Sequence, residues 1–411
     1  MKWFLLLLLV MSGCSKEPPS ANRLRISFCM QPTTTDPRQA GDFISSTLVC
    51  MVYDGLTRAA QGDRVEPALA ERVEVSKDLK VYTFHLCKAY WTDGKPITAQ
   101  DFEQSWKQIL QSASSCAFLF YPIKNAELSV KGQIPIEEVG IKALDERTLC
   151  VELERPTPYF YALTALPSFL PVALHAAGDP AVCSGPFVIE KMVHNSEIVL
   201  KKNQNYWNKE HIFLDEIHIS IVSDEMTALH MFEQGELDWL GGSISPLPPD
   251  ALDLLKDRLQ FIPCSASTFC TFNTERYPFN NVNLRKAFSY AIDRKEIVDQ
   301  VTQGGQTPAR SILPPSLTGQ DFSLFDPVRA RDYFEKALQE LQIEAKELEV
   351  LALYFKSSQV EKRLAQTLQR QWKDVLGVTI GLVQLDFKSQ MQKLEKRDYQ
   401  VSLASWIAHF H

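Results

Sequence analysis

Cysteine and histidine, the side chains that most readily act as nucleophiles or metal ligands, are spread widely along this chain of 411 residues. The nine cysteines include no C-x-x-C pair, and His409 and His411 are the only closely spaced histidines. A zinc site needs at least three protein ligands, and no third ligand accompanies this pair. Motifs of serine hydrolases, zinc proteases, nucleotide-binding loops and calcium-binding loops are absent. We therefore expect no catalytic residue, no metal site and no cofactor.

One cysteine, Cys14, stands in a context that indicates a modification. Lys2 and the apolar residues 3–11 are typical of an export signal, and Ser12 and Gly13 precede the thiol. The apolar stretch is too short to span a membrane, which takes roughly 20 residues. The pattern resembles a bacterial lipobox, which implies that residues 1–13 are a signal peptide, Cys14 carries palmitate or another acyl chain, and residues 14–22 are a tether. The alternative is a plain signal peptide with an incidental cysteine.

The other eight cysteines are even in number, and an exported protein folds in an oxidising compartment, so disulfides are allowed. Their pairing cannot be read from sequence. For a chain of this length we expect buried free thiols with at most one or two bridges.

Composition points to a globular protein with more than one core, because 45% of the residues are hydrophobic and 23% are charged. The formal net charge is −7, so no overall basic field attracts nucleic acid. We expect no nucleic-acid partner.

The elements predicted from local pattern are mixed helices and strands. Residues 81–87 alternate like a strand and lead to a turn at Asp93-Gly94, and Thr98 is predicted to cap a helix with an apolar stripe. A second helix is predicted to begin near Asp224 and to end at Gly235, followed by a strand at 237–240.

The second half repeats this organisation. Apolar spacing predicts helices over 284–292 and 360–376, and Asp326-Pro327 predicts the start of another. A strand is predicted at 378–385, after Gly377. The β-α-β order near Gly235 and Gly377 favours two α/β lobes, with the irregular segment 261–274 crossing between them.

Several longer motifs occur in a fixed order. They are Glu66-Pro-Ala-Leu-Ala-Glu-Arg-Val-Glu-Val-Ser-Lys-Asp, Tyr82-Thr-Phe-His-Leu, Trp91-Thr-Asp-Gly-Lys-Pro-Ile-Thr-Ala-Gln-Asp-Phe, Ser184-Gly-Pro-Phe, Asn203-Gln-Asn-Tyr-Trp, Gly235-Glu-Leu-Asp, Pro278-Phe-Asn-Asn-Val-Asn-Leu-Arg and Ala291-Ile-Asp-Arg. This series is similar to the signature of the periplasmic oligopeptide-binding proteins of ABC transporters, solute-binding protein family 5. The motifs belong to the scaffold, so they indicate the family more firmly than the ligand.

The resemblance implies an α/β, two-lobed periplasmic-binding-protein fold of class II type with an extra subdomain inserted in the first lobe. The first lobe would comprise residues 23–64 and 185–267, the inserted subdomain 65–184, and the second lobe 268–411. A peptide would bind between the lobes without chemical change and pass to the transmembrane subunits of an ABC permease. The protein would be a monomer in the periplasm or cell envelope, held at the membrane by its lipid.

The resemblance also implies particular ligand-binding residues. Gly41-Asp42-Phe43 and Ser405-Trp406-Ile407 fall where the family pairs with the ligand backbone, which suits a peptide added as a strand. Trp406 and Phe387 fall where aromatic walls face the ligand. The alternative for each aromatic residue is a place in the core.

Three positions depart from the family pattern. His409 stands where relatives hold the ligand ammonium with an aspartate, and Leu403 and Glu361 stand where some relatives carry cations for the ligand carboxylate. An imidazole titrates near pH 6.5, so we expect a free-amine peptide to bind more weakly as the pH falls through that range. The alternative function is therefore a receptor for a specialised cargo, such as a wall peptide, a metal chelate or haem.

Length is a further departure, because members of the family usually continue well beyond the position of Trp406. We expect the second lobe in 268–411 to be incomplete, which leaves an unpaired sheet edge. An inactive truncated fragment is thus another alternative.

Overall fold

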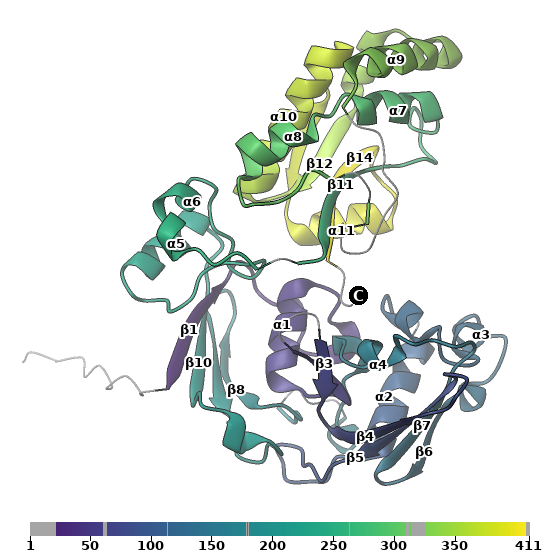
Figure 1. The fold of residues 1–411 in the computed structure, drawn as a ribbon, viewed down its shortest axis with the longest axis vertical. Helices are drawn as coiled ribbons and strands as arrows, with labels where there is room; N and C mark the ends of the chain where they lie inside the picture. Colours follow the sequence, from purple (N-terminus) through teal and green to yellow (C-terminus); the bar gives the residue numbers. More distant parts are fainter. Residues whose placement is uncertain are drawn as a thin grey trace, which may run out of the picture.

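The computed structural model describes residues 22–60, 64–112, 114–177, 179, 181–262, 264–309, 312–313 and 325–407. Figure 1 shows two lobes, with the sheets of the first below and the helices of the second above. Short 3-10 helices connect the main elements at Pro37–Gln39, Ala117–Phe120, Ile136–Glu138, Pro167–Phe169, Leu174–Ala176, Lys209–His211, Lys256–Arg258 and Ala345–Val350.

The first lobe contains a four-stranded sheet in the order β1-β10-β9-β8. Its strands are β1 (Arg23–Phe28), β8 (Phe187–Val193), β9 (Glu197–Lys202) and β10 (Glu216–Ile221). β1 runs parallel to β10, and the other pairs are antiparallel. Helix α1 (Phe43–Val52) follows β1, and the hairpin of β2 (Thr57–Ala60) and β3 (Arg64–Pro67) follows α1. The sheet thus joins segments from both sides of a long intervening stretch.

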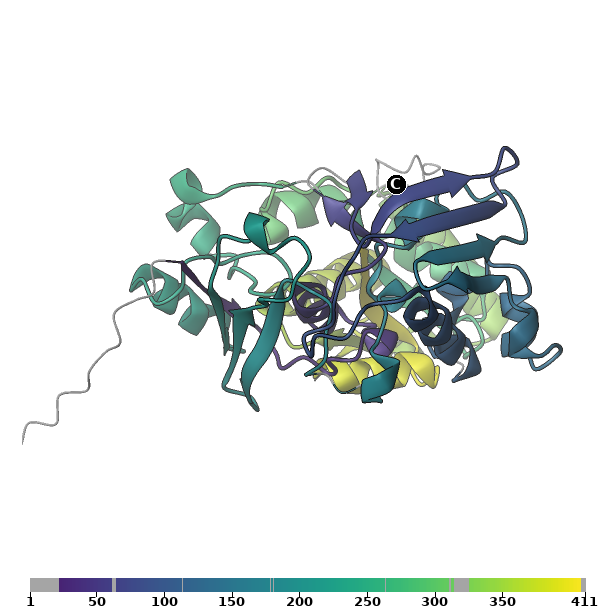
Figure 2. The same ribbon diagram turned by 90° about the horizontal axis from the view of Figure 1, so that it is seen from below.

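That stretch forms an antiparallel sheet of its own, in the order β4-β5-β7-β6. The strands are β4 (Ala70–Val75), β5 (Val81–Leu86), β6 (Ile141–Asp145) and β7 (Thr148–Glu152), and the helices are α2 (Ala99–Gln111), α3 (Ala126–Val130) and α4 (Phe160–Leu163). Seen from below, this sheet lies at one end of the lobe and the sheet of β1 at the other (Figure 2).

The local predictions for this sheet are confirmed. Alternate residues of β5 are buried, and Gly94 has the positive φ (85°) that suits the predicted turn. Thr98 caps α2, and the Asp101 carboxylate accepts a 2.8 Å hydrogen bond from the Thr98 N–H. These signals are local in sequence, so they act in the same way whatever the lobe around them.

Helices α5 (Glu225–Glu233) and α6 (Ala251–Leu254) form a small unit beside the first-lobe sheet. Asp224 caps α5 and Gly235 follows in the left-handed conformation, as predicted. The predicted strand at 237–240 was wrong. The Asp238 N–H does donate to the Arg25 carbonyl, but the Arg25 N–H donates to the Asp238 carboxylate at 2.7 Å. A side chain therefore replaces the backbone acceptor that a strand would offer.

The second lobe contains a sheet in the order β11-β14-β12-β13. Its strands are β11 (Ala266–Phe272), β12 (Ala352–Lys356), β13 (Gly381–Leu385) and β14 (Val401–Ile407). Its helices are α7 (Val282–Tyr290), α8 (Arg294–Glu296), α9 (Pro327–Leu341), α10 (Gln359–Leu376) and α11 (Phe387–Glu395), with a π-helix at Ile297–Thr302.

The helices predicted here, α7, α9 and α10, are confirmed, with Asp326 capping α9 and Gly377 ending α10 at a φ of 71°. The predicted strand at 378–385 is shorter, because pairing with β12 begins only at Gly381. The predicted crossing at 261–274 was too long. Residues 266–272 form β11, which pairs along its full length with β14, a partner that local pattern cannot reveal.

The described residues contain three hydrophobic clusters. The first-lobe sheet and the inserted sheet share one large cluster, and the second lobe has its own around the buried Trp372. A third, small cluster of Leu229, Ala251 and Leu255 joins α5 to α6. The α5–α6 unit is therefore packed separately from both main cores.

The eight cysteines of the described residues are free thiols: Cys29, Cys50, Cys87, Cys116, Cys150, Cys183, Cys264 and Cys270. Within the described ranges, no helix is both long enough and apolar enough to cross a bilayer.

Candidate ligand-binding site

The start of α1 presents the first group of predicted ligand-binding residues. Asp42 is the N-cap, and its carboxylate accepts hydrogen bonds from the Ser45 N–H at 2.8 Å and the Thr33 hydroxyl at 2.6 Å. Phe43 follows as the first helical residue with 46% of its surface exposed, and Gly41 precedes the cap. Because Asp42 is occupied at the helix end, Phe43 offers the larger free surface for a ligand.

The end of β14 presents the second group. The strand begins with the buried residues 401–403 and becomes exposed at Ser405 and Trp406, of which Trp406 is 58% exposed. The pairs Trp406–Ser267 and Ser405–Thr268 fix this end on β11, and the two hydroxyl oxygens of the second pair are 2.9 Å apart. Ile407 is half-buried. Figure 1 shows this end of β14 directed toward α1 of the first lobe.

Phe387 is the first residue of α11 and is half-buried. The helix is anchored on β14 by Gln390, whose side-chain amide donates to the Leu403 carbonyl at 2.8 Å. Leu403 is 3% exposed and packs in the second core, and Glu361 is buried in the first turn of α10. His409 and Cys14 lie outside the described residues.

The opposite end of α1 is held by a close backbone approach. The Gly185 N–H donates to the Val52 carbonyl at 2.9 Å, and a Cβ on Gly185 would lie 2.5 Å from the Tyr53 nitrogen. Only glycine fits at this separation. The Ser184-Gly-Pro-Phe motif therefore fixes the position of the helix that presents Phe43.

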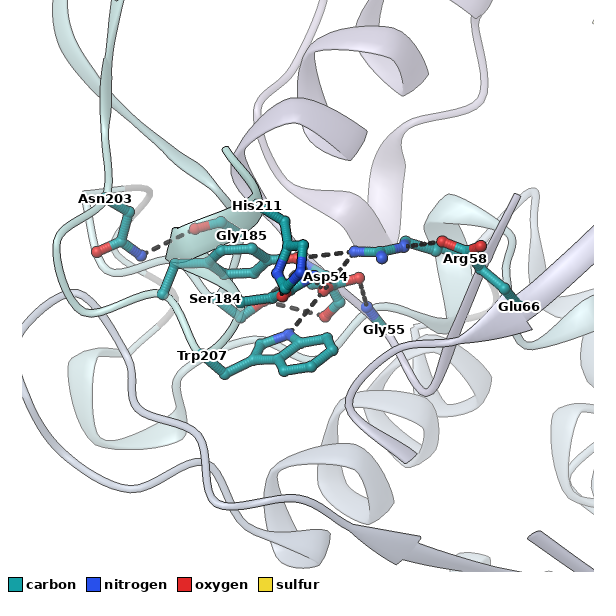
Figure 3. A network of polar contacts seen from close by, with 11 residues as sticks. Asp54, Gly55, Arg58, Glu66, Ser184, Gly185, Asn203, Trp207 and His211 are labelled. Atoms are coloured by element: carbon teal, nitrogen blue, oxygen red, sulfur yellow. Dashed lines mark hydrogen bonds and ion pairs between the residues drawn. The ribbon is translucent and has the colours of Figure 1, made fainter. Parts of the chain in front are cut away.

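A buried polar network surrounds Asp54, which follows Tyr53 after the end of α1 (Figure 3). Its carboxylate accepts hydrogen bonds from the Tyr206 hydroxyl at 2.7 Å, the Trp207 indole N–H at 3.0 Å and the Gly55 N–H at 3.1 Å. The Ser184 hydroxyl accepts from the Asp54 N–H at 2.9 Å. Sequence motifs far apart along the chain thus meet at one carboxylate.

Charge around Asp54 is balanced by Arg58. Its guanidinium lies 3.9 Å from the Asp54 carboxylate, donates to the Tyr206 hydroxyl at 3.0 Å and pairs with Glu66 at 2.7 Å. Burial raises the pKa of Asp54, while hydrogen bonds from Tyr206 and Trp207 act in the opposite direction. These contacts hold together the β2–β3 hairpin, the end of α1 and the segments next to β8 and β9. Asp54 is buried, so the network is a structural junction and not an accessible reaction centre.

The family model named bacterial extracellular solute-binding proteins, family 5 Middle, matches residues 64–411. The chain belongs to this family. It is 34% identical over 440 aligned positions to the oligopeptide-binding protein of Bacillus subtilis, covering 99% of this chain and 81% of that protein. It is 30% identical to a protein of Escherichia coli named a probable deoxycholate-binding periplasmic protein, covering 92% and 74% of the two chains.

Solved structures agree with this family 5 assignment. The periplasmic oligopeptide-binding protein of Borrelia burgdorferi superposes with a TM-score of 0.86 at 29% identity, covering 94% of this chain and 80% of the other. The two-lobed α/β fold predicted from sequence is therefore confirmed.

In this family 5 protein, sequence reasoning missed Asp54. The available signal was a single carboxylate inside the apolar run 48–56, since a buried charge requires partners. The motif Asn203-Gln-Asn-Tyr-Trp supplies those partners, and the Asn203 amide also donates to the Gly185 carbonyl at 2.8 Å. This motif, which indicated the family, thus also helps to hold the end of α1 in place.

The cavities found elsewhere in the described part of this family 5 protein include the following two. One, of about 500 Å³, is lined by residues of β4 and β5 together with Pro67, Leu79, Pro158 and Tyr161. The other, of about 300 Å³, lies between the π-helix and α10. Neither is lined by the predicted ligand-binding residues.

Proposed function

We propose that this protein binds oligopeptides between its two lobes and delivers them, chemically unchanged, to the transmembrane subunits of an ABC importer. The observation that carries the proposal is the 34% identity to the Bacillus subtilis oligopeptide-binding protein over nearly the whole chain. The moving units would be residues 23–267, which include the inserted subdomain, and residues 268–411. The protein would act as a monomer.

The geometry supports an extended ligand. The end of β14 carries the exposed Trp406 beside Ser405, and α1 presents Phe43 from the other lobe. A peptide lying as an added strand would gain backbone hydrogen bonds, while flat aromatic side chains would tolerate different ligand side chains. We therefore assign Gly41, Asp42, Phe43, Phe387, Ser405, Trp406, Ile407 and His409 as the residues to test for ligand contact.

The direct experiment is ligand capture from peptide mixtures of defined length. The protein, unfolded and refolded to remove bound ligand, is incubated with random tripeptides, pentapeptides and octapeptides, and retained species are identified by mass spectrometry. Retention of intact peptides of one length class supports the proposal, and release of shortened peptides would instead indicate an enzyme. No retention, in a sample with native circular dichroism, would contradict peptide binding.

A second candidate is a specialised cargo. The relative named for deoxycholate binding is 30% identical to this chain. The family resemblance also implies that His409 stands where relatives carry an ammonium-binding aspartate. The same refolded protein is therefore titrated calorimetrically with deoxycholate, a murein tripeptide and haem. Tight binding of one of these, together with no retention of the peptide mixtures, would favour the specialised receptor.

We also propose that the protein is held in the cell envelope by an acyl chain on Cys14. The sequence around Cys14 supports this anchor, and the permease partner follows from the proposed import role. Cys14→Ser should block acylation and leave the protein out of the membrane fraction. An unmodified N-terminus at another residue, in wild-type protein that stays soluble without detergent, would contradict the anchor.

A further inference from the structure

The two lobes make polar contacts beside the α5–α6 unit. The Gln359 N–H, at the first position of α10, donates to the Glu225 carboxylate at 3.4 Å. The Arg363 guanidinium pairs with Asp250 at 2.6 Å. Glu225 and Asp250 belong to the part of the chain before β11, while Gln359 and Arg363 belong to the second lobe. We call these four residues, with Lys356 and Glu361, the interlobe junction.

The position of Glu225 is unusual for a carboxylate. The residue is 8% exposed, and its Oε2 atom is buried without a hydrogen-bond partner. Its other oxygen lies at the N-terminus of α10, an 18-residue helix whose first N–H groups and dipole attract negative charge. The helix end thus draws Glu225 toward the second lobe, but satisfies only one of its two oxygens.

Lys356 does not pair with the second oxygen of Glu225, because it already pairs with Glu361. The Glu361 carboxylate accepts from the Lys356 N–H at 2.8 Å and lies 3.2 Å from its ammonium. Arg363 is likewise paired with Asp250. The junction therefore contains two buried carboxylates, Glu225 and Glu361, and its partly exposed cations, Lys356 and Arg363, pair with Glu361 and Asp250 rather than with Glu225.

We propose that Glu225 and the first turn of α10 form a pH-sensitive latch, which holds the two lobes together more strongly when Glu225 carries a proton. When Glu225 is ionised, this contact leaves a charged oxygen desolvated and unpaired, which costs free energy. Protonation neutralises the carboxylate and so removes the cost of burying its charge. The latch acts on the arrangement of the lobes, so it goes beyond ligand binding and does not depend on the ligand being a peptide.

The charged groups around Glu225 set the direction of the effect. Burial and the neighbouring Asp224 raise the pKa of Glu225, while the Gln359 N–H, Lys356 and Arg363 lower it by less. Glu361 and the Cys29 thiol also face this region, and burial raises the pKa of each. When the lobes separate, water returns the Glu225 pKa toward its ordinary value. The contact form binds the proton more tightly, so acidification favours contact.

The test measures the lobe arrangement in protein without ligand. Small-angle scattering is recorded on protein unfolded and refolded to remove ligand, at pH 7.5 and pH 5.0. The radius of gyration of the wild type should decrease at the lower pH. Glu225→Gln, which mimics the protonated carboxyl, should give the smaller radius at both values.

Two further variants distinguish the latch from the effect of removing any carboxylate on α5. Gln359→Pro removes the N–H that reaches Glu225 at a helix position where proline is tolerated, so it should fold and give a larger radius at pH 7.5. Ser358 already has the extended backbone (φ −149°, ψ 155°) that a following proline requires. Glu233→Gln alters an exposed carboxylate on the same helix and should behave like the wild type.

The proposal is overturned if Glu225→Gln keeps the wild-type change of radius between the two pH values, or if the wild type shows no change. Because no ligand is present, this outcome is independent of whether the protein binds peptides. Conversely, a latch that responds as expected would stand even if the peptide mixtures gave no retained species.

Discussion

At the scale of single residues, Asp54 shows how a family motif acts physically. Two aromatic side chains separated from it by about 150 positions, Tyr206 and Trp207, donate to one buried carboxylate. Removal of the carboxylate takes away the acceptor of both donors, at a place where Tyr206 is buried and Trp207 is half-buried. The cost of losing Asp54 is therefore larger than the net value of its hydrogen bonds.

We expect Asp54→Ala to lower the free energy of unfolding by about 3 kcal/mol, because it leaves the Tyr206 and Trp207 donors without their acceptor. Tyr206→Phe, which removes one donor and keeps the ring, should cost about 1 kcal/mol. Urea denaturation followed by circular dichroism measures both. Equal stability of Asp54→Ala and the wild type would mean that water replaces the carboxylate.

Trp406 is the residue whose exposure best fits a ligand contact. Exposed tryptophans at the centre of binding sites commonly contribute more than 1 kcal/mol, so Trp406→Ala should weaken binding of a retained ligand by about tenfold or more. Trp239, with 42% of its surface exposed, lies in the first lobe after α5 and provides the control. Calorimetric titration should show normal affinity for Trp239→Ala. An unchanged affinity for Trp406→Ala would place the ligand elsewhere.

At the scale of elements, the position of α1 depends on Gly185. The helix has its own N-cap in Asp42, but the cap does not determine where the helix lies in the lobe. That position is set where residues 52 and 53 meet Gly185, because the two backbones approach without a side chain between them.

Gly185→Ala should destabilise the first lobe by about 1–3 kcal/mol, because the added methyl group forces α1 away from its place. It should also weaken ligand binding, since Gly41 and Phe43 move with the helix. Gly381 is a suitable control, because a Cβ added there would lie 3.4 Å from the nearest atom, the Leu351 carbonyl oxygen, which is an ordinary contact distance. Gly381→Ala should retain both stability and affinity in thermal unfolding and calorimetry, and the two glycine variants behaving alike would contradict this explanation.

At the scale of the whole molecule, the described parts of the two lobes have separate cores and meet at the polar contacts of the interlobe junction. The second core is distinct from the first, and the short stretch before β11 joins them. Relative motion of two such units costs little buried apolar surface.

Binding of a ligand between the lobes should therefore reduce the radius of gyration in solution. A ligand that contacts both lobes favours the closed arrangement by the difference of its affinities for the two forms. Scattering with and without a retained ligand, at constant pH so that the interlobe junction is unchanged, measures this. An unchanged radius at saturation would exclude closure by the ligand.

The sequence alone determined those elements whose signals lie within a few residues of each other. The caps at Thr98 and Asp326, the turn at Gly94 and the stripe of α10 act over one or two helical turns, so the same residues specify them in any context. The family could also be named from sequence, because its motifs keep their order.

Only the tertiary structure decided which segments meet. The pairing of β11 with β14, the partners of Asp54 and the contact of Glu225 with α10 all join residues more than a hundred positions apart. The absence of the predicted strand at 237–240 has the same origin. The Arg25 N–H donates to the side-chain carboxylate of the distant Asp238 instead of to a backbone carbonyl. Such contacts depend on how the lobes pack, and packing is a property of the whole chain that no local pattern contains.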